Sequence, residues 1–234
     1  MKKNYLFTGL ISLFFTVLVW LTMVTSVKKG IPFSDASIFE YFGYAMNNGE
    51  LMYANLFDHK GPVIFIVNYL GYLIGGSLGI KLLYLFCTFF FFVISFLISK
   101  LFTGNKQSIL VLFLIFWSMN YFFDGGWSLE GYILPLISYS LYVFLKFFIK
   151  NNIKNYEIIL AGLCFAIVFF TKANMIGIWL IFGLYIIVHY VSLKRYKELI
   201  NTIVRFFIGV LIFTIPLFIY LIYKGVFLRC YINL

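Results

Sequence analysis

The sequence predicts an all-α, multi-pass membrane protein with about seven transmembrane helices and two further helices at the membrane surface. Two observations predict this fold class. Hydrophobic residues make up 63% of the chain and charged residues 11%, whereas a soluble globular protein is about half apolar and about a quarter charged. The apolar residues also gather into runs long enough to cross a bilayer as helices, which takes about 20 residues.

The charge pattern argues against a nucleic-acid-binding protein, and the cysteine pattern argues against a protein whose cysteines bind metal or act in redox chemistry. The net charge is +10, but the basic residues lie in short clusters between apolar runs, where charges that orient a membrane protein belong. We therefore expect no nucleic-acid partner. Cys87, Cys164 and Cys230 lack metal-ligand or redox spacing, so packing is their predicted role.

The first predicted span covers residues 5–27, which carry no charge and follow Lys2 and Lys3. A secretory signal peptide would have a shorter apolar core and a small-residue cleavage site. We therefore expect an uncleaved first span in the cell membrane with its N-terminus in the cytoplasm. Residues 28–81 then form an outer loop.

This outer loop holds four of the eight acidic residues of the chain. Ser37 and Glu40 have the spacing of a capping box, which predicts a short surface helix with Asp35 immediately before its start. The residues from Asn47 to Gly49 are typical of a helix end. Apolar residues recur at helical spacing between these signals and predict an amphipathic helix on the membrane surface: Ile38, Tyr41, Phe42, Ala45 and Met46.

The glycine-rich apolar run at 63–80 predicts either a short span or a second surface helix. The positive-inside bias favours a surface helix, because the later basic clusters then fall on the cytoplasmic side. The chain is then a single membrane domain, 1–234, without a soluble C-terminal domain. Within 82–222, the six remaining spans are predicted at about 82–99, 108–123, 131–148, 158–171, 174–190 and 200–222.

Five features occur in a characteristic order: Asp35 just after the first span, an amphipathic helix, the FDHKGP stretch from Phe57 to Pro62, a glycine-rich interfacial helix, and a second acidic outer loop. They resemble the GT-C glycosyltransferases, in particular the bacterial glycosyltransferase 39/83-like proteins related to protein O-mannosyltransferases and to the lipid A aminoarabinose transferase. The resemblance covers about residues 5–190. Family members are at least twice as long as this chain, which therefore corresponds to their N-terminal part.

The resemblance implies an enzyme that transfers a sugar, with inversion, from a polyprenyl-phosphate donor to an extracytoplasmic lipid, protein or polysaccharide. Asp35 matches the catalytic base, which takes the proton of the acceptor hydroxyl. Lys60 and Lys172 match lysines beside the donor phosphate, whose charge grows as it leaves. Simpler roles stand beside these: a helix cap for Asp35, attraction to lipid headgroups for Lys60, and an interfacial hairpin for Lys172.

Three further residues are candidates for acceptor or metal binding. Asp58 is suited to bind acceptor, to ligate a divalent cation, or to pair with Lys60. Glu130 resembles an acidic residue of the family's second outer loop and equally suits a helix N-terminus. His59 is a metal ligand or a solvated loop residue, and one histidine with two distant carboxylates is a poor metal pattern. A divalent cation is left open as a cofactor.

The alternative is a non-catalytic membrane protein: a degraded relative, or a component that transports or assembles envelope polysaccharide. Transporters usually place ionisable groups inside the membrane, where they mark the pathway, and the predicted spans are nearly free of charge. A groove that gathers Asp35, Lys60, Glu130 and Lys172 would favour the enzyme.

Overall fold

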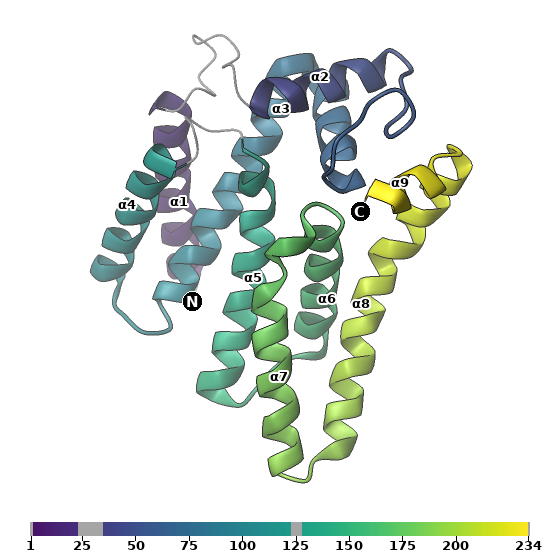
Figure 1. Cartoon of the computed structure of the whole chain (residues 1–234). Helices are drawn as coiled ribbons and strands as arrows, with labels where there is room; N and C mark the ends of the chain where they lie inside the picture. Colours follow the sequence, from purple (N-terminus) through teal and green to yellow (C-terminus); the bar gives the residue numbers. More distant parts are fainter. Residues whose placement is uncertain (1, 23–34, 123–127, 234) are drawn as a thin grey trace. The chain divides into compact units, whose positions relative to one another are not determined.

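The computed structural model describes residues 2–22, 35–122 and 128–233 (Figure 1). The end of the first predicted span (5–27) and the last residue of the third (108–123) lie outside the described residues. Among the described residues the chain is helical with short turns, and its β pairing is one isolated bridge between Met52 and Leu56. The chain divides into two compact units, which are described separately. Unit 1 comprises Met1–Glu50 and Ile64–Ser138, and unit 2 comprises Leu51–Val63 and Tyr139–Leu234.

Several long apolar helices indicate a multi-pass membrane protein. Within the part of the chain that the structure describes, four helices are long and apolar enough to cross a bilayer: α1 over Tyr5–Thr22, α3 (Pro62–Ser99), α5 (Leu129–Lys150) and α8 (Tyr196–Tyr223). Helices also form at the other three predicted spans, but they are shorter or begin with polar residues: α4 (Asn105–Phe122), α6 (Asn155–Phe169) and α7 (Gly177–Ser192). At 1.5 Å per residue, α6 and α7 are about 23 Å long, less than a hydrocarbon core of about 30 Å.

Helix α3 folds back on itself at Gly75 and Gly76, where the backbone is not helical. Gly76 has φ +60, which glycine adopts without strain. A Cβ at Gly79 would lie 2.1 Å from the carbonyl oxygen of Gly71, although residues this far apart in a straight helix are separated by about 12 Å. The limbs of α3 are residues 62–74 and 77–99. The first limb, about 20 Å long, is too short to cross a bilayer alone, and the break precedes the predicted boundary at residue 81.

The core of unit 1 lies where α1 (Lys2–Thr22), the second limb of α3, and α4 pack together. Phe15 of α1 is 3% exposed, and its ring centre lies 5.6 Å from that of Phe92. The buried cluster is Phe15, Val19, Leu85, Phe92, Phe96, Leu112 and Met119.

Helix α2 (Asp35–Asn47) packs on the first limb of α3. The rings of Phe42 and Phe65 stack with centres 4.4 Å apart. At Gly43, an added Cβ would lie 2.6 Å from the Asn68 carbonyl oxygen. The close approach of the two backbones therefore depends on glycine at this position.

The two ends of α2 differ in how well the sequence predicts them. The C-terminal prediction is confirmed: Gly49 has φ +93, and the amide of Glu50 donates to the Ala45 carbonyl at 3.1 Å, as in a Schellman motif. The N-terminal prediction is wrong, because the helix already includes Asp35. Glu40 is buried inside the unit. Of the predicted apolar face, Phe42, Ala45 and Met46 are buried in unit 1, whereas Ile38 and Tyr41 are exposed; its contact with the membrane surface stays a prediction.

In unit 2, α6 and α8 pack most closely where Gly162 and Gly209 meet. A Cβ at Gly162 would lie 2.0 Å from the Phe206 carbonyl oxygen, and one at Gly209 would lie 1.9 Å from that of Ile159. Small residues at such crossings let helix backbones touch. The short helix α9 (Phe227–Asn233) follows α8.

Helices α5 and α7 pack beside this pair. The rings of Phe144 in α5 and Phe182 in α7 stack with centres 4.7 Å apart. Lys146 of α5 forms an ion pair with Glu157 of α6, and Glu157 also accepts a hydrogen bond from the Lys154 amide at 2.8 Å. These contacts join α5, α6 and α7 within unit 2.

Candidate functional site

The 57–62 loop, which contains the FDHKGP stretch, is organised around a buried carboxylate. Asp58 is 8% exposed, and its Oδ1 accepts a hydrogen bond from the Lys60 amide at 2.9 Å. This contact between a side chain and the backbone two residues on is typical of Asp in turns. The Lys60 ammonium lies 3.5 Å from Asp58 Oδ2. Of the three roles considered for Asp58, the structure therefore contains the ion pair with Lys60; acceptor binding and cation ligation stay predictions.

His59 is the exposed neighbour of Asp58 in this loop. Its side chain is 84% exposed, and its Nδ1 lies 3.4 Å from Asp58 Oδ1. Within the described residues no group of three His, Cys, Asp or Glu side chains is placed to hold a metal ion. The structure thus places His59 beside Asp58, and the metal-binding roles of His59, Asp58 and Glu130 stay predictions.

The 57–62 loop is docked on the C-terminal end of α6 by its backbone. The amide of Gly61 donates to the Thr171 carbonyl at 3.1 Å, and the amide of Val63 donates to the Phe170 carbonyl at 3.2 Å. A Cβ at Gly61 would lie 2.0 Å from the Phe170 carbonyl oxygen. Only glycine permits so close a contact, so the loop and the end of α6 are fitted to each other.

This docking brings together two of the predicted site residues. Lys60 directly precedes Gly61, and Lys172 directly follows Thr171, so the two lysines flank the hydrogen bond between those residues. Lys172 also directly precedes the short 3₁₀ helix η1 (Ala173–Met175). The backbones of two lysines far apart in the sequence therefore lie close together in unit 2, and both side chains are partly exposed.

Tyr53 supports the loop from inside unit 2. Its hydroxyl donates to the Lys60 carbonyl at 2.6 Å, and its side chain is 7% exposed. Its φ of 59 is unusual for a bulky residue, and such conformations concentrate at functional sites. Burial raises the pKa of Tyr53, and Cys230 adds to this rise. Burial likewise raises the pKa of the Cys230 thiol, while the contact with Tyr53 opposes that rise.

The other two predicted site residues belong to unit 1. Asp35 is exposed in the first turn of α2, and Glu130 is half-buried in the first turn of α5. Both carboxylates lie where a helix dipole favours negative charge. The catalytic role of Asp35 and the acceptor role of Glu130 stay predictions, and stabilisation of a helix N-terminus is the simpler role for both.

Unit 1 also contains a buried polar cluster that sequence reasoning missed. Glu40 of α2 is 8% exposed and Lys81 of α3 is 7% exposed. Burial raises the pKa of Glu40, and the charge of Lys81 opposes this rise. One turn after Lys81, Tyr84 packs on Gly131, where an added Cβ would lie 2.1 Å from its ring. Tyr84 also packs edge-on against the ring of Tyr132.

A sequence signal for this cluster existed in part. Lys81 is a lone cation between two apolar runs, which in a membrane protein indicates a partner or a function. The spacing of Ser37 and Glu40 predicts a helix cap for Glu40 instead of a partner for Lys81. The Glu40 Oε2 atom has no hydrogen-bond partner among the described residues.

Comparisons of the chain with protein-family models, with curated proteins and with solved structures returned no match. The local geometry and chemistry of the two units therefore carry the functional conclusion.

Proposed function

We propose that the chain is a membrane glycosyltransferase, or the N-terminal part of one, that uses a polyprenyl-phosphate sugar donor. The docking of the 57–62 loop on the end of α6 carries this proposal. The resemblance implies a donor-phosphate role for Lys60 and for Lys172 separately, and the backbone hydrogen bond between Gly61 and Thr171 brings the backbones of these two lysines close together. Paired cations suit a leaving group that gains charge in the transition state.

In the proposed reaction the acceptor hydroxyl attacks the anomeric carbon of the sugar. The bond between that carbon and the phosphate oxygen breaks with inversion, and polyprenyl phosphate leaves. Asp35 takes the proton of the hydroxyl as general base. Asp58 holds Lys60 in place through the ion pair and the amide contact, so that Lys60 and Lys172 meet the charge on the phosphate.

The proposal includes a topology of seven spans with a cytoplasmic N-terminus. The spans are α1, the second limb of α3, and α4 to α8, and α2 and the 57–62 loop lie on the outer side. The fold-back within α3 supports this count, because it leaves the first limb too short to cross alone. Local thinning of the bilayer accommodates the short helices α6 and α7. The cytoplasmic segments then carry the basic clusters Lys100 and Lys106; Lys146, Lys150 and Lys154; and Lys194, Arg195 and Lys197.

A transfer assay in membrane vesicles tests the proposal. Radiolabelled polyprenyl-phosphate sugars are supplied with a cell-envelope extract as acceptor, and the intact chain is compared with Asp35→Asn. The matched control is Glu50→Gln, which removes an exposed carboxylate just beyond the other end of α2. We expect transfer by the intact chain and the control, and a loss of at least about 100-fold in Asp35→Asn, because a general base contributes 10²–10⁴-fold.

The paired lysines give a second readout. If both meet the same phosphate, the losses in Lys60→Gln and Lys172→Gln are less than additive in the double variant, as for residues that share a partner. Lys100→Gln, on a turn exposed to solvent, is the control. Absence of transfer by an intact, membrane-inserted chain would rule out activity of this chain by itself and favour a non-catalytic role.

A further inference from the structure

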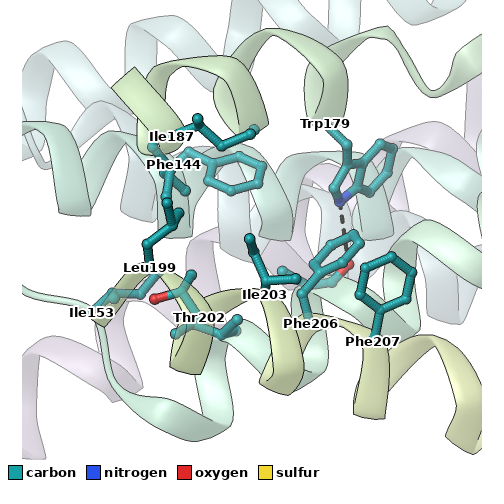
Figure 2. A pocket seen from close by; sticks show the side chains of 13 residues that line it. Phe144, Ile153, Trp179, Ile187, Leu199, Thr202, Ile203, Phe206 and Phe207 are labelled. Atoms are coloured by element: carbon teal, nitrogen blue, oxygen red, sulfur yellow. Dashed lines mark hydrogen bonds between the residues drawn. The ribbon is translucent and has the colours of Figure 1, made fainter. Parts of the chain in front are cut away.

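Unit 2 contains an apolar cavity of about 150 Å³ between α5, α6, α7 and α8 (Figure 2). Its lining has two polar side chains, and both are already satisfied. The Trp179 indole donates to the Ala161 carbonyl at 3.1 Å, and the Thr202 hydroxyl donates to the Glu198 carbonyl at 2.8 Å. The cavity therefore offers no free hydrogen-bonding side chain, and its apolar lining suits a hydrocarbon ligand.

A glycine keeps part of this cavity open. Gly183 of α7 is among the lining residues, and a Cβ built at this position would meet nothing within 4 Å. A larger side chain at Gly183 would thus enter empty space without displacing a neighbour. A substitution at Gly183 can therefore fill the cavity without moving the surrounding helices.

One end of the cavity is close to a group of exposed cations. Figure 2 shows Ile153 and Leu199 at one end of the lining and Trp179 at the other. Lys154 directly follows Ile153, and Lys194 and Lys197 shortly precede Leu199. All three lysines are exposed.

The acidic residues at this end are already engaged. Glu157 is paired with Lys146, and Glu198 with Arg195. Among the described residues, none of the three exposed lysines has an acidic partner within ion-pair distance. The cavity thus combines an apolar interior with an unneutralised basic end.

We propose that this cavity binds one acyl chain of an anionic membrane phospholipid, whose phosphate headgroup lies against Lys154, Lys194 and Lys197. The apolar lining matches the chain, and the cations match the headgroup, since lysines at a membrane surface attract anionic lipids. This lipid site goes beyond the proposed glycosyl transfer: it uses none of the residues assigned to that reaction, so either proposal can fail without the other.

Quenching of Trp179 fluorescence by brominated lipids tests the site. Trp179 lines the cavity and is 5% exposed, so bromine on a lipid chain reaches it through the cavity. A variant that retains Trp179 while Trp20, Trp117 and Trp127 are replaced by Phe is reconstituted in vesicles. One set of vesicles contains brominated phosphatidylglycerol, and a second set contains the same mole fraction of brominated phosphatidylcholine. The matched control retains Trp117, which is 66% exposed.

We expect brominated phosphatidylglycerol to quench Trp179 at a lower mole fraction than brominated phosphatidylcholine does. Trp117 should be quenched equally by both. Each Lys→Gln change at the basic end should weaken the preference about five-fold. Gly183→Leu should abolish quenching of Trp179, whereas Gly9→Leu should not, because Gly9 is also a helical glycine with nothing within 4 Å but lies in α1.

Two results would overturn the proposal. The first is that both brominated lipids quench Trp179 equally and that Gly183→Leu does not change this quenching. The cavity would then hold no lipid chain. The second is displacement of the quencher by unbrominated polyprenyl phosphate but not by unbrominated phosphatidylglycerol. That result would replace the phospholipid with an isoprenoid lipid.

Discussion

A single methyl group added at Gly61 should release the 57–62 loop from the end of α6. The Cβ of Gly61→Ala would lie 2.0 Å from the Phe170 carbonyl oxygen. The contact is with backbone rather than with a flexible side chain, so the loop itself must move. Two hydrogen bonds are then lost, those from the amides of Gly61 and Val63. At about 0.5–1.5 kcal/mol each, their loss lowers the free energy of loop opening by about 1–3 kcal/mol.

Thiol labelling of Cys230 measures this opening. Cys230 is 2% exposed and contacts Tyr53, whose hydroxyl binds the Lys60 carbonyl. Labelling by a water-soluble maleimide therefore requires local opening, and its rate follows the open population. With the other two cysteines replaced by Ala, we expect Gly61→Ala to accelerate labelling by about 5- to 150-fold, since 1.4 kcal/mol is a factor of ten.

Gly177→Ala is the matched control, because a Cβ there would meet nothing within 4 Å. Its labelling rate should equal that of the parent chain. The two variants are compared only as folded, monodisperse protein. If Gly61→Ala labels at the parent rate while folded, the backbone contacts do not hold the loop. The argument that unites Lys60 and Lys172 would then be wrong.

Three other predictions follow from buried contacts. Lys81→Met should lower the free energy of unfolding, because it removes the charge that favours the ionised form of the buried Glu40, and the double variant with Glu40→Gln should recover much of this loss in denaturant unfolding. Because the pKa of Glu40 is raised, the folded state binds its proton more tightly, so stability should fall as pH rises above 4.5, the ordinary pKa. This slope should steepen in Lys81→Met and vanish in Glu40→Gln. Gly209→Ala should destabilise the chain, because its Cβ would lie 1.9 Å from the Ile159 carbonyl oxygen. Gly183→Ala should instead stabilise the chain by about 0.5–1 kcal/mol through helix propensity. Equal shifts of the melting temperature in the two variants would contradict the close crossing of α6 and α8. Tyr53→Phe should lower the free energy of unfolding by about 1 kcal/mol, because the hydrogen bond to the Lys60 carbonyl is lost, and it should speed maleimide labelling of Cys230. An unchanged unfolding free energy and labelling rate would show that this hydrogen bond is not stabilising.

Local sequence patterns predicted the helices well. The uncharged apolar runs correspond to helices because a chain in lipid must satisfy its backbone internally. The end of α2 was predictable because Gly49 adopts a positive φ that few other residues tolerate. The break in α3 was harder to place, because several glycines occur in that run and only the observed backbone shows that the chain turns at Gly75 and Gly76.

The start of α2 shows why local signals have limits. A capping box and a helix that begins at Asp35 both fit the sequence, and packing decides between them. Glu40 lies inside unit 1 near Lys81, a residue far along the chain, so no local pattern could reveal its burial.

The sequence by itself determined the class of the protein, the approximate positions of its helices and the residue types available for chemistry, because these follow from composition and local periodicity. Tertiary structure alone decided which of those residues meet. Lys60 and Lys172 come together through two backbone hydrogen bonds and a glycine contact between the 57–62 loop and the end of α6. Such contacts depend on backbone positions in space, and the identities of neighbouring residues along the chain do not encode them.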